Sequence, residues 1–239
     1  MFRTNPENIL FIDIETVSLY PDYSAVPENW KALWNKKSMV LKKKEESDSP
    51  ETLYNQAGIY AEFGKIVCIC AGYIKKGEAG PQFRLKSFAG HDEKKLLLDF
   101  ADLLNRHFSG PAHRLCAHNG KEFDFPWIAR RMLVHGIPLP DLLNVSGKKP
   151  WETQLLDTME MWKFGDYKNF TSLNVLAALF DVPTPKDDID GSQVHHVYYN
   201  EKDLERIVTY CMKDVLTVAQ ILRRYRREPL IAEEAVVVI

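Results

Sequence analysis

The sequence predicts an α/β fold built on a mixed sheet, and three patterns indicate it. An apolar strand opens the chain at residues 9–14, two further strands at 65–74 and 83–88 are separated by a short turn, and helical and extended segments alternate afterwards. Strands joined by a tight turn are antiparallel, whereas strands separated by helices are commonly parallel. We therefore expect an α/β sheet with an antiparallel hairpin at one side. No Gly-x-Gly-x-x-Gly follows the first strand, which argues against a Rossmann sheet.

The size and composition of the chain favour one domain. Its 239 residues, 45% of them hydrophobic, allow one sizeable core and are short for two independent cores. We expect a single domain at 1–239 with an insertion at about 19–62, where Pro, Lys, Trp and Tyr interrupt the apolar pattern. The net charge of -2 gives no overall attraction for phosphate, so a nucleic acid would need a local basic groove, stacking or bound metal ions.

The sequence shows neither a membrane span nor a secretory signal. No run of eighteen apolar residues is present and the N-terminus lacks an apolar stretch, so we expect a soluble, cytoplasmic protein without membrane association. The four cysteines lie in apolar segments and should be buried free thiols. Cys68 and Cys70 point to the same face of one strand, but no other Cys or His motif accompanies them, so burial is favoured over a zinc half-site.

The first strand and the segment after it differ in composition. Residues 9–14 are apolar except for Asp13, a pattern typical of a central strand buried on both faces. In the insertion, Trp30, Leu33 and Trp34 fall at helical spacing, so we expect an amphipathic helix packed on the body, with a base-stacking platform as the alternative. The charge run at 42–46 should be solvated.

The later elements follow from apolar periodicity and turn residues. The hairpin turn is expected at 77–81, where Gly77, Gly80 and Pro81 separate the two strands. A helix is expected at 92–108, because apolar residues recur at helical period after two acids that suit a helix start. The other expected elements are a strand at 114–117, a helix at 125–134, a segment at 155–162 that fits either a strand or a helix, a short helix at 173–180, a last helix at about 201–225, and an apolar tail at 235–239 that would form an edge strand or a partner contact.

Two acids stand in the most apolar strand. Asp13 and Glu15 are two residues apart, so their side chains point to the same face, about 6.6 Å apart along the strand. Burying two like charges is costly unless cations compensate them, and hard divalent ions such as Mg²⁺ favour carboxylate oxygens. The pattern suggests a cation site. The alternative is that the strand ends at Ile12 and that both acids are loop or cap residues beside Thr16.

Two further acids occur at positions where ligands commonly gather. Asp124 lies between the strand at 114–117 and the next helix, a place typical of ligand sites in open α/β sheets but also of helix caps. In the last helix, Tyr210 and Asp214 are four residues apart at the border of the apolar stripe, so they face the same neighbourhood. This pair is either functional or a partly buried tyrosine beside a salt-bridged aspartate.

Together these residues resemble the three motifs of the DEDD exonuclease superfamily. The motifs are Asp13-x-Glu15, Asn119 followed by Phe123-Asp124, and Tyr210-x-x-x-Asp214. The tyrosine marks the DEDDy branch, because the histidine branch would carry its His where Thr209 stands. The second motif is similar to that of the proofreading domains of B-family DNA polymerases. Since no polymerase domain follows, the chain resembles the stand-alone bacterial relatives of that domain.

The resemblance implies a fold, an activity and cofactors. The fold would be ribonuclease-H-like, an α/β mixed five-stranded sheet with the second strand antiparallel, flanked by helices. The activity would be 3′-5′ exonuclease hydrolysis of phosphodiester bonds, at the 3′ end of single-stranded DNA or RNA, with DNA favoured. Two divalent metal ions, Mg²⁺ or Mn²⁺, about 3.5–4 Å apart would serve the attacking and the leaving oxygen.

The resemblance also implies catalytic roles. Asp13, Glu15 and Asp214 would hold one ion, with Asp13 shared and Asp124 supporting the second ion. Tyr210 would orient the attacking water rather than deprotonate it alone, since an unperturbed phenol has a pKa near 10.

Substrate contacts and rival functions complete the expectations. Thr16, Asn119 and Phe123 would contact the terminal nucleotide, although Phe123 is equally typical of a core aromatic. His195 and His196, in the loop before the last helix, are expected to be structural or exposed rather than ligands. The rival functions are a 3′-5′ exoribonuclease and a non-catalytic nucleic-acid or protein interaction module that kept the fold.

Overall fold

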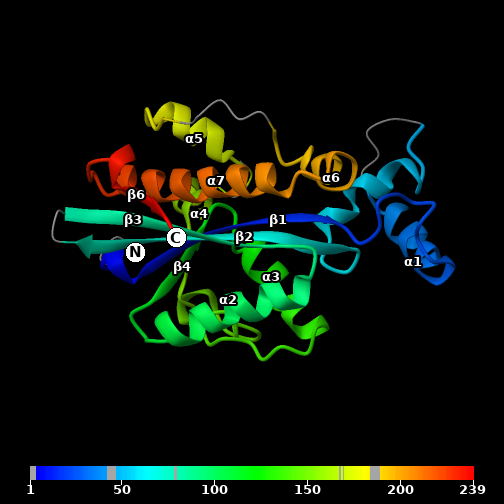
Figure 1. The fold of residues 1–239 in the computed structure, drawn as a ribbon, viewed down its shortest axis with the longest axis horizontal. Coiled ribbons are helices and arrows are strands. Elements are labelled where there is room, and N and C mark those ends of the chain that lie inside the picture. The colour runs from blue at the N-terminus through cyan, green and yellow to red at the C-terminus, as the bar shows by residue number, and fades with distance from the viewer. Residues whose placement is uncertain (1–3, 42–46, 78–79, 167, 169, 184–188) are drawn as a thin grey trace.

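A mixed sheet forms the centre of the molecule, with helices on both faces (Figure 1). The computed structural model describes residues 4–41, 47–77, 80–166, 168, 170–183 and 189–239. Its helices are α1 (Glu28–Ser38), α2 (Glu93–His107), α3 (Asp124–Val134), α4 (Thr158–Lys163), α5 (Leu173–Leu179), α6 (Val194–His196) and α7 (Leu204–Tyr225). Helices α4, α6 and α7 cover one face of the sheet, with α5 packed on the outer side of α7, and α2 and α3 cover the other face. No helix in this described part of the chain is long and apolar enough to span a membrane.

The strand order matches the ribonuclease-H-like expectation. The strands are β1 (Ile9–Ser18), β2 (Gly64–Gly77), β3 (Gly80–Ala89), β4 (Arg114–Ala117), β5 (Leu155–Asp157) and β6 (Val236–Val238), arranged in the order β5-β4-β1-β2-β3-β6. β2 runs antiparallel to both β1 and β3, whereas β1, β4 and β5 are parallel to one another. The prediction of a mixed sheet with an antiparallel second strand is confirmed.

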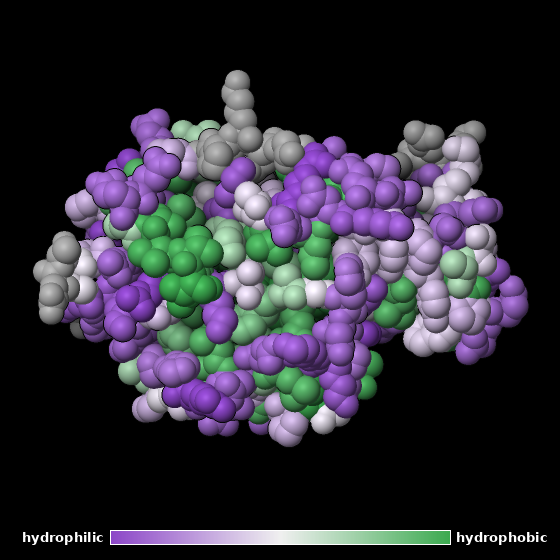
Figure 2. Space-filling model, viewed as in Figure 1, coloured by the Kyte–Doolittle hydropathy of each residue, from purple (hydrophilic) through white to green (hydrophobic). Residues whose placement is uncertain are grey.

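The C-terminal tail adds a sixth strand to the five that were expected. β6 pairs in parallel with β3, so Phe83 lies beside Val236. Figure 2 shows hydrophobic side chains gathered on this edge of the sheet, between α7 and α2. Val238 and Ile239 there are 62% and 56% exposed. Of the two alternatives for the tail, the edge strand is the one that forms.

Most of the other predicted elements form within a few residues of their expected ends. The segment at 155–162 fits both a strand and a helix because it contains one of each, and Asp157 separates them. Its carboxylate accepts hydrogen bonds from the backbone N–H groups of Met159 and Glu160, at 2.9 and 3.3 Å. These bonds cap α4 and end β5.

The 19–62 segment forms its own small apolar cluster beside the sheet. Trp34 of α1 is fully buried, makes edge contacts with Tyr54 and Phe63, and donates from Nε1 to the Pro50 carbonyl at 2.7 Å. The expected helix forms and buries Trp34, but it packs against its own segment and not on the body of the protein as expected. The prediction was wrong for Leu33, which is 50% exposed, because the cluster contacts only the face of α1 that carries Trp30 and Trp34. The charge run at 42–46 lies outside the described residues.

A buried ion-pair network ties α2 and α3 to the sheet. Glu93 accepts hydrogen bonds from the Arg131 guanidinium at 2.7 to 3.2 Å and from the Ile66 backbone N–H at 2.7 Å. Arg131 also donates to the Ala61 carbonyl at 3.0 Å, and His135 Nε2 lies 2.7 Å from Glu93. Because these bonds join α3 to β2, they fix the helix that begins at Asp124.

Replacing Glu93 by alanine leaves the Arg131 guanidinium buried without its counter-charge. We expect the free energy of unfolding to fall by about 3–5 kcal/mol. Asp99→Ala breaks the exposed Lys95–Asp99 pair, whose atoms are 2.6 Å apart, and as the control should cost only about 0.3–0.5 kcal/mol. Urea unfolding followed by circular dichroism measures both losses. Equal losses would mean that the buried network contributes no more than a surface pair.

Candidate active site

Two carboxylates project from the central strand toward α7. Asp13 and Glu15 lie on the face of β1 whose apolar neighbours, Ile9 and Phe11, pack in the cluster beneath α7. Glu15 is buried, and Asp13 is partly buried with its Oδ2 atom fully enclosed. A register shift in the β1–β2 pairing follows directly, between Glu15 and Thr16. The strand therefore carries both acids to the point where its regular pairing is interrupted.

A third carboxylate reaches the same place from the opposite side of the sheet. Asp124 is the first residue of α3 and is 3% exposed. Its Oδ1 atom accepts a hydrogen bond from the Ile14 backbone N–H at 3.1 Å. Since Ile14 stands between Asp13 and Glu15, this bond fixes Asp124 beside both of them.

The last helix supplies Tyr210 and a fourth carboxylate. The apolar stripe of α7, which includes Ile207, Cys211 and Val215, packs on the sheet, so the residues at its border face the end of β1. Tyr210 and Asp214 are one turn apart there and share a side-chain hydrogen bond. The structure therefore brings the five predicted catalytic residues into one neighbourhood.

The electrostatics confirm that the carboxylates are close and poorly hydrated. Burial, and after it the charges of Glu15, Asp124 and Asp214, raise the pKa of Asp13 well above its usual range. Burial, a charge on Cys68 and the charges of Asp214 and Asp124 raise the pKa of Glu15 in the same way. Burial is also the main cause that raises the pKa of Asp124 to about 7. Each carboxylate thus makes ionisation of its neighbours harder.

The donor set suits a hard divalent cation. Asp13 Oδ2 is buried and has no hydrogen-bond partner among the described residues. A buried acceptor without a partner is costly, and a cation bound by carboxylate oxygens would satisfy it and offset the repulsion. One carboxylate oxygen each of Asp13 and Glu15 lies within 4.8 Å of the other and of Cys211 Sγ. These residues therefore fit the metal ions that the sequence motifs imply.

A groove of about 450 Å³ opens beside the carboxylates. Glu15, Thr16 and Phe123 line it from the body of the protein, and Asn55 and Gln56 line it from the 19–62 segment. These last two residues belong to a 3-10 helix at Thr52–Ile59. The 19–62 segment therefore forms one wall of the groove.

Close packing holds that wall against β1. Thr16 Oγ1 donates to the Gly58 carbonyl at 2.6 Å. A Cβ atom at Gly58 would lie 3.0 Å from the Val17 carbonyl carbon, so glycine permits this approach. The hydroxyl proton of Thr16 is consequently committed to Gly58, and only the oxygen lone pairs and the backbone of Thr16 can meet a ligand.

The loop that precedes Asp124 is held by another buried acid. Asp157 accepts from the backbone N–H groups of Asn119 at 2.9 Å and of Lys121 at 3.0 Å. Asn119 adopts a φ of 62°, a left-handed conformation that asparagine tolerates better than most residues. Phe123 is half-buried and packs against Trp127, with ring centroids 6.2 Å apart. Phe123 is thus partly a core aromatic and partly a groove residue.

The sequence reasoning missed two groove residues, Asn55 and Gln56, and the acid that holds the Asn119 loop, Asp157. Asn55, Gln56 and Asp157 belong to no motif, and only the tertiary fold brings them to the site. His195 also lines the groove, but Nδ1 lies 3.0 Å from Ser18 Oγ and Nε2 lies 2.9 Å from the Pro21 carbonyl. With both ring nitrogens occupied, His195 has a structural role, and His196 is exposed.

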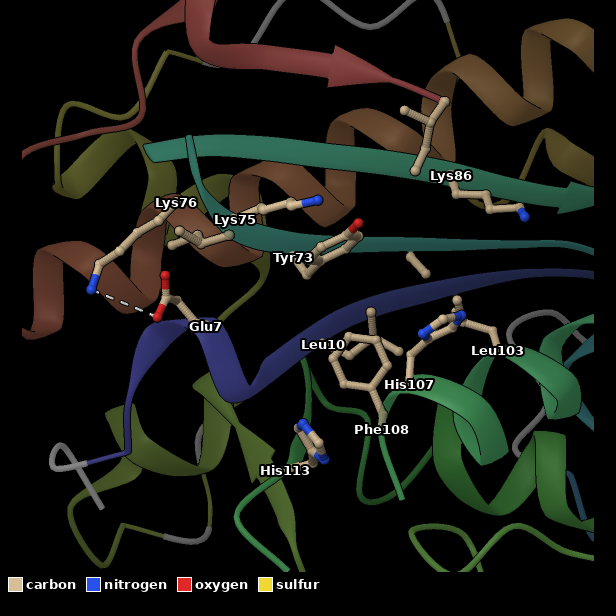
Figure 3. A pocket seen from close by; sticks show the side chains of 13 residues that line it. Glu7, Leu10, Tyr73, Lys75, Lys76, Lys86, Leu103, His107, Phe108 and His113 are labelled. Atoms are coloured by element: carbon tan, nitrogen blue, oxygen red, sulfur yellow. Dashed lines mark ion pairs between the residues drawn. The ribbon is translucent and has the colours of Figure 1, made fainter. Parts of the chain in front are cut away.

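A second cavity, of about 530 Å³, lies away from the carboxylates (Figure 3). It opens between the β2–β3 hairpin and the end of α2, with Lys75 and Lys86 at its rim and Tyr73 and Phe108 inside. Leu10 lines it, and Leu10 packs on the face of β1 opposite to the one that carries Asp13. None of the predicted site residues lines this cavity.

The strand order places this chain in the class of ribonuclease-H-like folds, and four carboxylates cluster beside its central strand. Residues 59–227 match the family described as "Predicted 3'-5' exonuclease related to the exonuclease domain of PolB", and the chain belongs to this family. The family expected from the motifs is thereby confirmed. A comparison with curated proteins found no match.

Among solved structures, the chain is similar to the "X-ray structure of the RNase domain of the yeast Pop2 protein". The two sequences are 12% identical, and the TM-score is 0.48. The similarity covers 92% of this chain and 77% of the other chain.

The raised pKa of Asp124 has a consequence for stability. The folded protein holds a proton on this carboxyl up to a pKa of about 7, whereas an unfolded chain releases it near the ordinary value of 3.8. Between these two pH values the folded state binds more protons than the unfolded state. The free energy of unfolding of the metal-free protein should therefore fall as the pH rises through this window.

Asp124→Asn removes this titration and keeps an Oδ1 acceptor for the Ile14 N–H. In EDTA at pH 8 we expect the variant to be more stable than the wild type by roughly 1–3 kcal/mol, and the difference should shrink as the pH falls toward 4. Scanning calorimetry across this pH range measures it, with Asp99→Asn as the exposed control. If Asp124→Asn were less stable than the wild type at pH 8, the buried Asp124 carboxylate would not be the group that destabilises the metal-free protein at high pH.

Proposed function

We propose that residues 1–239 act as one 3′-5′ exonuclease domain that hydrolyses phosphodiester bonds of single-stranded nucleic acid, with DNA favoured. The observation that carries the proposal is the convergence of four carboxylates from three separate segments beside a groove. Membership of a family related to a DNA polymerase exonuclease domain supports the preference for DNA. The 19–62 segment acts as an insertion that completes the groove.

The metal ligands of this proposal are the four carboxylates. Asp13, Glu15 and Asp214 hold one divalent ion, Mg²⁺ or Mn²⁺, and Asp13 and Asp124 hold a second. Such ions, when bound, lower the pKa of water and neutralise charge on the leaving oxygen. The protein's own contribution is position, because the Ile14 N–H···Asp124 bond and the packing of α7 fix the carboxylates before substrate arrives.

Tyr210 positions the attacking water in this proposal. Burial, and after it the charges of Asp214, Glu15 and Asp13, raise the pKa of its phenol above the ordinary value. The phenol therefore stays protonated at neutral pH and donates its proton to Asp214, so its oxygen can orient the water by accepting a hydrogen bond and does not act as a base. Its bond with Asp214 keeps the ring beside the carboxylates.

Two groove residues, Thr16 and Phe123, and the nearby Asn119 bind the terminal nucleotide in this proposal. Phe123 offers an aromatic face on which a base can stack, a contact that tolerates any base. Asn119 offers an amide with both donors and an acceptor, and Asp157 fixes its backbone. Thr16 contributes its backbone and its hydroxyl lone pairs, since its proton is committed to Gly58.

Digestion of end-labelled strands tests the activity. Single-stranded DNA and RNA, labelled at the 5′ end, should be shortened stepwise from the 3′ end with Mg²⁺ or Mn²⁺ and left intact in EDTA. Asp13→Asn should lower the rate by ~10³-fold, which corresponds to about 4 kcal/mol in the barrier. Asp99→Asn, on the exposed side of α2, should keep the wild-type rate.

Comparing the digestion of DNA with that of RNA distinguishes the proposed exonuclease from an exoribonuclease and from a non-catalytic binding module. Faster shortening of RNA than of DNA would make the protein an exoribonuclease. Binding of strands without shortening under any metal would identify a non-catalytic module and end the proposal of an exonuclease.

Tyr210→Phe tests the positioning role separately from metal binding. Loss of the hydroxyl should lower kcat by about 10- to 100-fold, because a misplaced nucleophile costs this much. The affinity for Mg²⁺, measured by calorimetry, should stay within about twofold of the wild type. An unchanged kcat would remove Tyr210 from the reaction, and a loss of Mg²⁺ affinity would show that it supports the carboxylates instead.

A further inference from the structure

Three buried free cysteines lie directly beside the carboxylates. Cys68 and Cys70 belong to β2, and Cys211 belongs to α7. The three Sγ atoms all lie within 4.8 Å of one another, and the Sγ atoms of Cys68 and Cys70 are 3.6 Å apart. The proposed exonuclease reaction uses none of these thiols, so their clustering has another origin.

The register of the sheet places the thiols on the same face as the acids. In the antiparallel β1–β2 ladder, Cys70 stands opposite Asp13 and Cys68 stands opposite Glu15. Residues opposite one another in such a ladder point to the same face. Cys211 covers that face from α7 and lies 3.4 Å from the Asp13 carbonyl oxygen. Three sulfur atoms and two carboxylates therefore form one continuous set of ligand atoms.

The spacing suits a tetrahedral thiophilic cation. A Zn–S bond is about 2.3 Å long, so two sulfurs on a tetrahedral zinc are separated by about 3.8 Å. The separation between Cys68 and Cys70 is close to that value, and the Cys211 Sγ atom lies within 4.8 Å of both. The candidate for the fourth ligand is Glu15, which stands opposite Cys68 in the ladder and has a carboxylate oxygen within 4.8 Å of Cys211 Sγ. Its side chain must turn toward Cys68 and Cys70 to complete the tetrahedron.

We propose that Cys68, Cys70 and Cys211 bind a zinc ion with Glu15 as the fourth ligand, in a site that adjoins the carboxylate site for Mg²⁺ and shares Glu15 with it. Thiolates select zinc, whereas magnesium prefers oxygen ligands, so one face of the sheet offers two sites of different chemistry. Binding forms three Zn–S bonds and one Zn–O bond and releases the thiol protons to the buffer. No electron is transferred, and no oxidant is required.

Zinc at this site controls the exonuclease, a consequence that rests on the proposed function. Glu15 cannot complete the zinc tetrahedron and serve the catalytic ion in full at the same time. Occupancy of the thiol site therefore inhibits hydrolysis. The three thiols are fully buried, and Glu15 is the proposed zinc ligand that also lines the groove.

Cobalt spectroscopy tests the site without any assay of activity. Titration of the metal-free, reduced protein with Co²⁺ should produce an intense near-ultraviolet band from thiolate-to-cobalt charge transfer, which added Zn²⁺ removes. Cys68→Ser and Cys70→Ser should each weaken the band. Cys116, the fourth buried free cysteine, lies outside the cluster, so Cys116→Ser should leave the band unchanged. A band of equal strength in all variants, or none in the wild type, overturns the site.

A second measurement on the wild type avoids dependence on the folding of the variants. X-ray absorption at the zinc edge of the protein loaded with one equivalent of Zn²⁺ should show sulfur scatterers at about 2.3 Å. A first shell of oxygen and nitrogen alone overturns the proposal even if the serine variants unfold.

Zinc inhibition at constant Mg²⁺ tests the consequence for hydrolysis. Cys68→Ser should need at least ten times more Zn²⁺ for half-inhibition than either the wild type or Cys116→Ser. Equal sensitivity of all three proteins means that zinc only displaces magnesium, and it overturns the regulatory part of the proposal. A cobalt band in a protein that degrades no strand leaves the thiol site standing while the proposed exonuclease fails, so the two failures are distinguishable.

Discussion

Mutual repulsion among buried carboxylates is the constraint on which the rest of the structure depends. Burial raises the pKa values of Asp13, Glu15 and Asp124, and neighbouring carboxylate charges, that of Asp214 among them, raise these values further. Such a cluster cannot stabilise itself, so rigid surroundings must hold it together. The central strand, covered on both faces, and the long apolar stripe of α7 provide that rigidity. Active sites commonly concentrate unfavourable charge in this way, because the same carboxylates bind cations that neutralise them.

Backbone geometry accounts for how the acids meet from both faces of the sheet. One hydrogen bond, from the Ile14 N–H to Asp124, joins α3 to the strand that carries Asp13 and Glu15. The Glu93–Arg131 network anchors the same helix to β2. The position of Asp124 therefore depends on bonds that lie on the side of the sheet away from α7. Stability and site geometry are coupled through α3.

Local periodicity explains which features could be predicted from the sequence. The two-residue spacing of Asp13 and Glu15 and the four-residue spacing of Tyr210 and Asp214 are properties of a single strand and a single helix. Contacts between distant segments could not be predicted in this way. Asn55 reaches the groove only because Gly58 lets a 3-10 helix approach β1, and Leu33 is exposed because the 19–62 segment packs one-sidedly. The sixth strand, left open as an edge strand or a partner contact, required knowledge of the β3 edge.

The cysteine cluster also depends on contacts between distant segments, so local sequence patterns could not predict it. Within the sequence, Cys68 and Cys70 are an incomplete pair, and the missing third thiol comes from a helix 141 positions later in the chain. The ladder register then sets Cys70 opposite Asp13 and Cys68 opposite Glu15. Because strand pairing, and not sequence proximity, determines which side chains share a face, hard oxygen ligands and soft sulfur ligands become neighbours around Glu15. In the proposed arrangement, ligand softness would decide which cation binds, and Glu15 would be the residue for which the two sites compete.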